Sequence, residues 1–360
     1  MSRINVTQTF LPDFDEYAKI LKRAWDKKWI TNNGELAQEL ETKLKEYLGV
    51  KHLLFTGNGT IVLQMAIKAM GITGEIITTP FSYVATTNAI LWEGCTPVFV
   101  DIHPENYTID VSKIEEAITE KTQAILATHV YGVPCDIEAI QKIADKYQLK
   151  VIYDGAHAFG SKYKGNQILS YGDVSTCSFH ATKLFHTVEG GCIITDNDEL
   201  AAKLRLYRSF GHIGDDYFDM GINGKNSEFH AAMGLAVLPH LPMLIESRRK
   251  ASQSYDTLLG NARIKRLKIE DESNFNYAYY PVVFDTHEDM GAVKTALEKE
   301  NIFPRRYFYP SLNNLPFLNE KVAMPISDDI SSRVLALPLY AEIENEVIEK
   351  ICSIIRANIV

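Results

Sequence analysis

Two side chains in the middle of the chain have the types and positions of catalytic groups. The apolar run 151–153 ends in Asp154, which places a carboxylate at the end of a buried strand, the edge where ligands collect in α/β sheets. Lys183 follows the apolar run 175–179, where burial would lower the pKa of the amine and suit it to attack a carbonyl carbon. Each residue alone also has an ordinary interpretation: Asp154 could cap a helix or close a turn, and Lys183 could extend to solvent.

A glycine-punctuated turn, Gly57-Asn58-Gly59, precedes the helical pattern 60–70. Successive N–H groups at the start of a helix bind anions, so Asn58, Gly59 and Thr60 could hold a phosphate group, although glycine turns alone mostly serve geometry. The turn lacks the lysine of a P-loop, which argues against an ATP site. An aspartate, a lysine and a phosphate cradle are together what pyridoxal 5'-phosphate (PLP) needs: a partner for the ring nitrogen, a Schiff-base amine and an anchor.

The elements that must position these residues predict an α/β fold. Leucines at helical spacing predict a helix over 35–48, closed by Gly49, and further helical patterns cover 136–147 and 199–210. Strand-like runs cover 52–56, 76–78, 97–101, 124–130, 151–154, 175–179 and 192–196. Several of these runs are apolar throughout, as expected of strands that helices cover on both faces.

A second, smaller domain is expected after residue 240. The helical pattern from Ser227 contains Pro239 and Pro242, and prolines divide or kink a helix, so this segment should bridge two lobes. We therefore assign 1–240 to a large domain and 241–360 to a small α+β domain. Its predicted strands cover 277–284, 303–309 and 333–337, and its predicted helices cover 288–300 and 342–358.

Composition narrows the classes of function. A chain of 360 residues, 46% of them hydrophobic, is long enough for one large core plus a smaller lobe. The net charge of -9 argues against a nucleic-acid partner. Five scattered cysteines without a C-x-x-C pair argue against a disulfide framework or a zinc site. The chain lacks a signal peptide and an apolar run of about 20 residues, so we expect no membrane segment and a place in the reducing cytosol.

Several runs of the sequence resemble those of the DegT/DnrJ/EryC1/StrS sugar aminotransferases. They are TPFSYVATTNAI (79–90), VIYDGAHAFG (151–160), SFHATKLFHTVEGG (178–191) and MGINGKNSEFHAAMGL (220–235), followed in order by YFYP (307–310) and LPLY (337–340). The resemblance implies the fold of type I PLP aminotransferases: a large domain with a mixed, mostly parallel seven-stranded sheet and a small C-terminal α+β domain. It also implies a homodimer with active sites at the subunit interface.

The resemblance implies a role for each matched residue. Lys183 would form the Schiff base with PLP, Asp154 would pair with the ring nitrogen, and His157 would contact the ring or its phenolic oxygen. Tyr83 would stack on the ring, although alone it reads as a core tyrosine in a helix. The implied phosphate contacts are Asn58, Gly59, Thr60 and Ser178, with Asn223 of the partner subunit. The implied substrate contacts are His186, Glu189, Lys225 and Tyr309. We interpret His180 as structural, and Asn223 alone would read as a turn residue.

Departures from the family pattern bear on specificity. Asn58 stands where serine is frequent, and Gly155 stands where alanine is frequent. Lys225 stands where arginine is common, and lysine binds a phosphate as a point charge while arginine binds it as a bidentate fork. Related sugar 3-dehydratases carry histidine at the position of Lys183, so the lysine favours transamination over dehydration.

The resemblance also implies the reaction. L-Glutamate would give its amino group to the cofactor, leaving pyridoxamine phosphate, and a nucleotide-linked keto sugar would accept it. The TVEGG run (187–191) resembles enzymes acting at C4, which predicts conversion of dTDP-4-keto-6-deoxy-D-glucose to dTDP-4-amino-4,6-dideoxy-D-glucose for bacterial surface polysaccharide such as O-antigen. The alternatives are a UDP-4-keto or dTDP-3-keto sugar, or a non-catalytic regulatory protein that binds PLP or a sugar nucleotide. Intact Lys183, Asp154 and His157 argue against the last.

Overall fold

A seven-stranded sheet forms the centre of the large lobe in the computed structural model, which describes residues 3–270 and 274–359. The strand order is β2-β10-β9-β6-β5-β3-β4, and β10 runs antiparallel to both neighbours while the other pairings are parallel. The strands are β2 (His52–Thr56), β3 (Glu75–Thr78), β4 (Thr96–Phe99), β5 (Thr122–Thr128), β6 (Lys150–Asp154), β9 (Val174–Ser178) and β10 (Gly191–Thr195). The predicted α/β class and the mixed, mostly parallel sheet are therefore confirmed.

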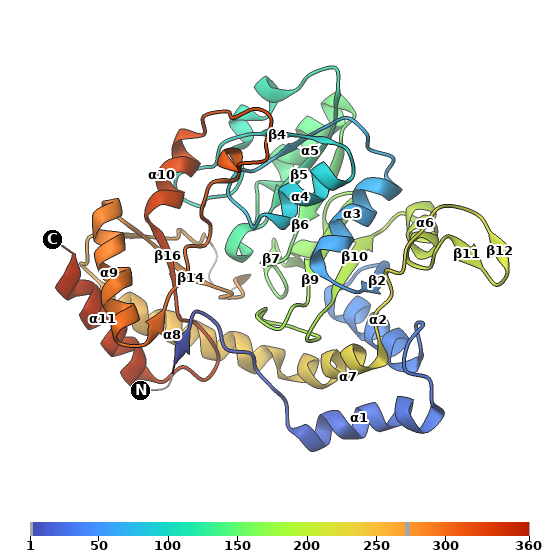
Figure 1. Cartoon of the computed structure of the whole chain (residues 1–360), viewed down its shortest axis with the longest axis horizontal. Helices are drawn as coiled ribbons and strands as arrows, with labels where there is room; N and C mark the ends of the chain where they lie inside the picture. Colours follow the sequence, from blue (N-terminus) through green and yellow to red (C-terminus); the bar gives the residue numbers. More distant parts are fainter. Residues whose placement is uncertain (1–2, 271–273, 360) are drawn as a thin grey trace.

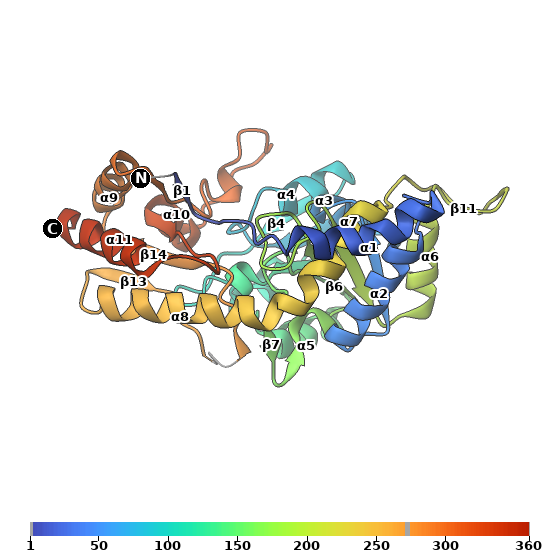
Figure 2. The ribbon, with the colours of Figure 1, turned by 90° about the horizontal axis from the view of Figure 1, so that it is seen from below.

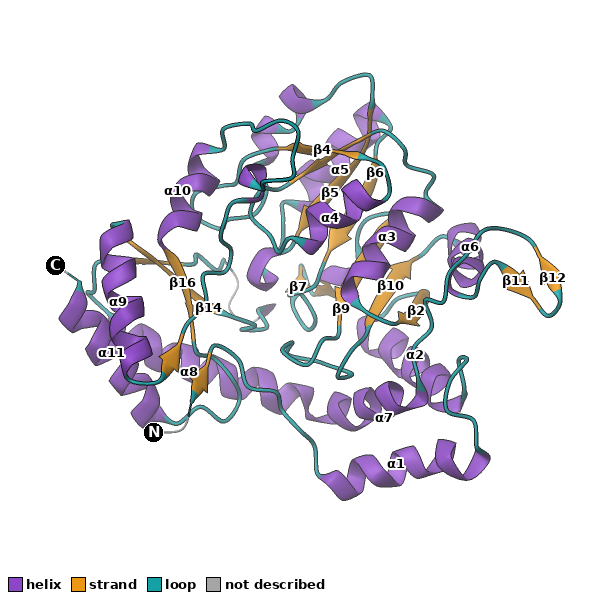
Figure 3. Cartoon of the chain, in the orientation of Figure 1, coloured by secondary structure: helices purple, strands orange, loops and turns teal. Residues whose placement is uncertain are grey.

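Helices cover both faces of this sheet (Figure 3). On one face pack α3 (Gly59–Ala69), α4 (Ala85–Trp92) and α6 (Asp198–Arg208). On the other face lie α2 (Glu35–Leu48), α5 (Ile137–Tyr147) and α7 (Glu228–Val237). Neighbouring strand residues enter opposite clusters, as Ile76 and Ile77 do, and both are fully buried. Burial on both faces explains why these strands read as continuous apolar runs.

The predicted long helix after Ser227 is divided where its prolines lie. The single turn η5 (Leu238–His240) separates α7 from α8 (Leu241–Leu259), and α8 extends beneath the small lobe (Figure 2). Within the described residues, the stretch Glu228–Leu259 is long and apolar enough to cross a membrane, but half of its most apolar window is buried. A core helix has the same composition. The domain boundary at residue 240 stays a prediction.

The small lobe is built on a three-stranded antiparallel sheet, β13 (Ile264–Arg266), β14 (Tyr280–Phe284) and β16 (Val334–Leu337). Around it lie α9 (His287–Lys299), α10 (Pro325–Arg333) and α11 (Asn345–Asn358). Near the N-terminus, β1 (Ile4–Asn5) pairs in parallel with β15 (Ile302–Phe303), so both ends of the chain lie on this lobe (Figure 1). The predicted strand over 303–309 is wrong for most of its length: β15 ends at Phe303, Arg305 forms only an isolated β-bridge with Ala336, and the residues that follow form a loop. Pro304 and Pro310 lack the N–H that a continuous strand would need.

The remaining elements lie outside the two central sheets. Helix α1 (Phe14–Lys27) packs along α7, and the hairpin of β11 (His212–Ile213) and β12 (Asp216–Tyr217) projects away from the large lobe (Figure 1). A second short hairpin joins β7 (Lys162–Tyr163) and β8 (Asn166–Gln167). Short 3-10 turns occur at Val111–Lys113, Glu115–Ala117, Val130–Gly132, Ile168–Ser170 and Leu312–Asn314.

Candidate active site

A cavity of about 300 Å³ opens at the carboxyl ends of the parallel strands, between the sheet and the small lobe. It collects residues from the start of α3, the β3–α4 loop, the end of β6, the β9–β10 loop and the small lobe. Among the residues predicted from the sequence, those that line it are Asn58, Gly59, Thr60, Tyr83, Asp154, His157, Ser178, Lys183 and Glu189. The cavity therefore holds the predicted catalytic and cofactor residues, apart from the one expected from a partner subunit.

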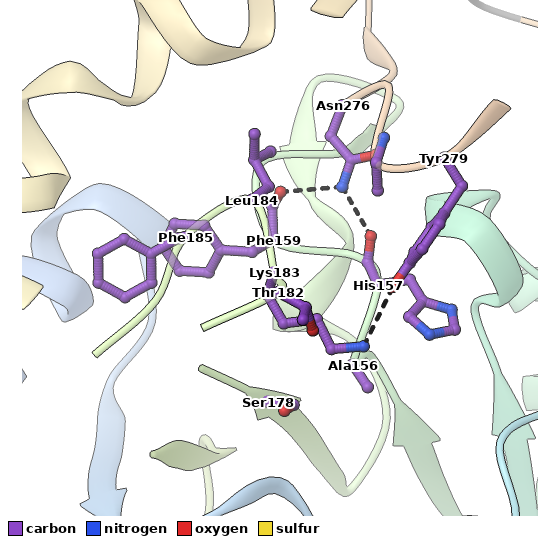
Figure 4. A pocket seen from close by; sticks show the side chains of 11 residues that line it. Ala156, His157, Phe159, Ser178, Thr182, Lys183, Leu184, Phe185, Asn276 and Tyr279 are labelled. Carbon is purple, nitrogen blue, oxygen red and sulfur yellow. Dashed lines mark hydrogen bonds between the residues drawn. The ribbon is translucent and has the colours of Figure 1, made fainter. Parts of the chain in front are cut away.

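Lys183 lines the cavity from the β9–β10 loop, and Figure 4, a close view of a neighbouring small pocket, shows its amine directed at Tyr279. Its Nζ lies 3.3 Å from the hydroxyl oxygen of Tyr279. Burial lowers the pKa of the amine, but Tyr279 and the carboxylate of Asp154 outweigh burial, so the pKa is raised. This direction is opposite to the one expected from the sequence. The amine of the free chain is thus protonated near neutral pH and must lose a proton before it can attack an aldehyde.

Asp154 ends β6 with its side chain buried, 5% exposed. Its Oδ2 accepts a hydrogen bond from the Thr86 hydroxyl at 2.7 Å, and its Oδ1 accepts one from the Ala156 N–H at 3.1 Å. Burial raises the pKa of Asp154, while Thr86, Ala156 and the charge of Lys183 oppose that rise. A carboxylate in this position can stabilise a positive charge on a cofactor ring.

His157 presents a fixed, neutral imidazole to the cavity. Its Nδ1 accepts from the Tyr131 N–H at 3.2 Å, so the proton of the neutral ring is on Nε2. The ring lies parallel to Phe308 at 5.4 Å between centroids, with 8° between the planes, and meets Tyr279 edge-on. Burial, assisted by the charge of Lys183, holds the pKa of His157 well below its usual value. The side chain can therefore donate from Nε2 without carrying charge.

The phosphate cradle predicted at the start of α3 depends on Gly59. A Cβ added to Gly59 would lie 2.6 Å from the Cβ of Ser178, so only glycine permits this approach of α3 to the end of β9. Asn58 caps the helix, its Oδ1 accepting from the N–H groups of Thr60 at 3.0 Å and Ile61 at 2.9 Å. The Thr60 N–H therefore already donates to Asn58. The Gly59 N–H and the hydroxyls of Thr60 and Ser178 are left to meet a phosphate group, which fits PLP.

Two of the predicted substrate contacts lie outside this cavity. His186 is fully buried, and its Nε2 lies 2.7 Å from the carbonyl oxygen of Phe10, so it holds the N-terminal segment against the β9–β10 loop. Tyr309 is 55% exposed and stacks under the Arg306 guanidinium at 3.3 Å from the ring centroid. The geometry of the single chain places neither residue in the cavity. Their contact with substrate therefore stays a prediction.

Asn223 and Lys225 are also absent from the lining of the cavity in their own chain. Asn223 forms an isolated β-bridge with Ser209, and the Lys225 amine lies 4.8 Å above the ring of Phe210. Burial, followed by the charge of Arg208, lowers the pKa of Lys225. Neither residue lines the cavity, although the Gly57 N–H donates to the Gly224 carbonyl at 3.0 Å and so holds this segment against the turn before α3. The predicted contacts of Asn223 and Lys225 across a subunit interface stay predictions.

Several cavity residues were not predicted. Tyr279, Arg305, Tyr307 and Phe308 come from the small lobe. Tyr307 and Phe308 lie in the YFYP run that resembles the family, but only Tyr309 of that run was selected, and nothing in the sequence pointed to Tyr279 or Arg305. Thr86 lies within the run 79–90 but was not selected. His180, interpreted as structural, lines the cavity, with its Nδ1 2.8 Å from the Thr182 hydroxyl and its Nε2 3.5 Å from Glu189.

Comparison with known proteins gives consistent matches over the whole length. The chain matches the DegT/DnrJ/EryC1/StrS aminotransferase family over residues 13–356. The Escherichia coli protein named dTDP-4-amino-4,6-dideoxy-D-glucose transaminase is 42% identical over 365 residues, covering 98% of each chain. The crystal structure of DesI in the presence of its TDP-sugar product superposes with a TM-score of 0.94, at 32% identity, covering 99% of this chain and 93% of DesI. NtdA from Bacillus subtilis, with bound cofactor PMP, superposes with a TM-score of 0.87 at 28% identity, covering 95% of this chain and 81% of NtdA.

Proposed function

The chain belongs to the DegT/DnrJ/EryC1/StrS aminotransferase family, and we propose that it transfers the amino group of L-glutamate to dTDP-4-keto-6-deoxy-D-glucose, giving dTDP-4-amino-4,6-dideoxy-D-glucose. The observation that carries this proposal is that Lys183, Asp154 and the phosphate cradle at Gly59 face one cavity. The E. coli relative, similar over its full length, supports this choice of sugar. The product would serve bacterial surface polysaccharide such as O-antigen, and we expect the enzyme in the cytosol.

The cofactor is PLP, whose ring supplies an electron sink for a carbanion at the reacting carbon. Asp154, which is buried at the end of β6, would keep a proton on the ring nitrogen, because its carboxylate would stabilise that positive charge. Gly59, Thr60 and Ser178 would hold the phosphate group, and Tyr83 and His157, which line the same cavity, would bound the ring. Lys183 Nζ takes the proton from the α-carbon of glutamate and later delivers a proton to C4 of the sugar.

The raised pKa of Lys183 has a consequence for binding of the cofactor. The amine is protonated in the free chain, and Tyr279 stabilises that charge through its hydroxyl. Capture of the PLP aldehyde needs the neutral amine, so raising the pH toward the pKa of Lys183 increases the reactive fraction. Tyr279 therefore helps to position Nζ and also opposes its deprotonation.

The identity of the sugar is tested by a panel of substrates. The purified protein is incubated with PLP, L-glutamate and each of the dTDP-4-keto, UDP-4-keto and dTDP-3-keto sugars, and the products are identified by NMR. We expect amination at C4 and turnover with the dTDP-4-keto-6-deoxy sugar at least about tenfold above the others, since one well-placed polar contact changes binding by that amount. Amination at C3 would contradict this assignment and identify a dTDP-3-keto sugar as the substrate. Preference for the UDP sugar would identify a UDP-4-keto sugar instead.

We further propose a homodimer in which the β11–β12 hairpin reaches the partner's cavity. Apolar side chains exposed along this segment are Phe210, Ile213, Tyr217, Phe218, Met220 and Ile222. An apolar patch of this kind on a projecting hairpin is typical of a surface that another protein covers. Asn223 and Lys225 come directly after it, which supports their predicted contact with phosphate groups in the second subunit.

Complementation between two inactive variants tests this arrangement. Lys183→Ala removes the amine of its own site, and Asn223→Ala impairs the site of the partner. Mixed dimers then contain one site with both residues intact, so equilibrated mixtures should recover about a quarter of wild-type activity, as statistical pairing predicts. Activity that stays at the level of the separate variants, although sedimentation shows exchanged dimers, would contradict a shared site.

A further inference from the structure

Three hydroxyl groups form a buried chain that ends on Asp154. The Thr86 hydroxyl, on α4, lies 2.7 Å from Oδ2 of Asp154 and 2.8 Å from the Ser82 hydroxyl in the β3–α4 loop. The Thr128 hydroxyl, at the end of β5, lies 3.3 Å from that of Ser82. None of the three side chains is more than 2% exposed. The chain thus connects Asp154 with two neighbouring segments of the large lobe.

The direction of these hydrogen bonds follows from the protons available. Each hydroxyl has one proton, and an ionised carboxylate can only accept. If Asp154 is ionised, Thr86 must donate to it, and Thr86 can then only accept from Ser82. Ser82 has then used its proton and accepts from Thr128. All three O–H groups therefore point toward Asp154, and donors aligned in this way strengthen one another in a buried site.

We propose that Thr86 is a positioning residue for the reaction: it is the last donor of a Thr128–Ser82–Thr86 relay that orients Asp154 and keeps it ionised against the cofactor ring. This inference rests on the proposed function, which supplies the PLP ring nitrogen as the partner of Asp154. Thr86 itself acts only through Asp154. A hydrogen bond to a charged group is worth more than one between neutral groups, so removing this donor should be measurable.

The surroundings of Asp154 make it depend on this donor. Among the described residues, the charged group that acts on its carboxylate is Lys183, since burial keeps His157 neutral and raises the pKa of the thiols of Cys135 and Cys177. Burial favours the protonated acid, and Thr86, Ala156 and Lys183 oppose it. Loss of the Thr86 hydroxyl therefore shifts Asp154 further toward the neutral acid, and the carboxylate is lost at a higher pH than in the wild type.

The test compares three substitutions on one helix. Thr86→Val removes the hydroxyl while keeping the shape of the side chain, and Thr86→Ser restores it. Thr87→Val is the matched control, because Thr87 is equally buried on α4 and its hydroxyl has no partner among the described residues. The measurements are the dissociation constant for PLP, the absorbance spectrum of bound PLP between pH 5 and 9, and the rate at which glutamate bleaches it.

For Thr86→Val we expect bleaching about tenfold slower and weaker PLP binding, with the acid limb of the rate profile moved up by about one pH unit, the effect of losing one charge-assisted hydrogen bond. Thr86→Ser should return close to wild type, and Thr87→Val should match it throughout. A Thr86→Val profile that coincides with those of Thr87→Val and the wild type would overturn the inference.

Two controls keep this result separate from other failures. If wild-type protein binds PLP but is not bleached by glutamate, the proposed function fails, whatever the variants do. If Thr86→Val does not fold, Ser82→Ala breaks the relay one bond farther from Asp154, and a shift of the acid limb in the same direction, smaller in size, is expected. No shift in that variant would count against the relay.

Discussion

Replacing Lys183 with alanine should abolish the yellow colour that PLP gives to the protein and lower amino transfer by at least roughly 10³-fold. The amine both binds the PLP aldehyde and moves the proton between carbons, and loss of general acid–base catalysis alone costs roughly 10²–10⁴-fold. The measurements are the absorbance of the protein dialysed against PLP and the rate of product formation from the keto sugar. Thermal unfolding of the PLP-free proteins should be similar, because Lys183 is only partly buried and its side-chain contact is one hydrogen bond to Tyr279.

Lys183→Arg is the matched control for charge. Arginine keeps a positive charge near Tyr279 and Asp154 but stays protonated at the pH values of the assay, so it cannot act as the nucleophile. We expect this variant to be as inactive as Lys183→Ala. A Lys183→Ala enzyme that still forms the amino sugar at the wild-type rate would show that another group carries the chemistry.

Asp154→Asn should lower turnover by roughly 10²–10³-fold, the usual effect of removing one preorganised electrostatic contact from an active site. The amide cannot carry the negative charge that keeps the ring nitrogen protonated. The amide oxygen of this variant can still accept from the Thr86 hydroxyl, but the amide nitrogen then faces the Ala156 N–H, so we expect the melting temperature to fall slightly. The rates of the glutamate half-reaction and the melting temperatures of both proteins check this expectation.

A second variant, Asp154→Ala, tests whether turnover at this position is lost through the chemistry or through folding. It leaves the Thr86 hydroxyl without its acceptor, so it should lower the melting temperature somewhat and turnover strongly. Undiminished transamination in either Asp154 variant would exclude the proposed role. If turnover fell only because the variant folds incompletely, activity would recover at lower temperature. We do not expect such a recovery.

The parts of the site that the sequence predicts are those set by local structure. Asp154 ends an apolar run and Gly59 opens a helical one, so their places at the edge of the sheet follow from the pattern around them. The prediction of a strand over 303–309 was wrong for most of its length: this aromatic run also contains Pro304, and Tyr307 and Phe308 line the cavity from a loop. Aromatic side chains are frequent both in strands and in loops that line a cavity, and the local sequence pattern does not distinguish these two cases.

The remaining features depend on contacts between distant segments. Tyr279 reaches Lys183 from the small lobe, and its hydroxyl reverses the direction of the expected pKa shift. His186 was expected near the substrate because it follows Lys183 closely, but the N-terminal segment supplies it with a buried partner in Phe10. The role of Thr86 depends on Oδ2 of Asp154, which lies on another element, at the end of β6. Such pairings arise from the tertiary fold and leave little trace in spacing.

The central claim is that Lys183 and Asp154 work on PLP to move an amino group, and one spectroscopic experiment tests it most directly. Purified wild-type protein is loaded with PLP, its visible absorbance is recorded, and L-glutamate and then dTDP-4-keto-6-deoxy-D-glucose are added. We predict that the yellow band bleaches with glutamate and returns with the keto sugar, as both half-reactions require. A band that no amino donor bleaches would contradict the claim and favour a protein that binds PLP without turnover.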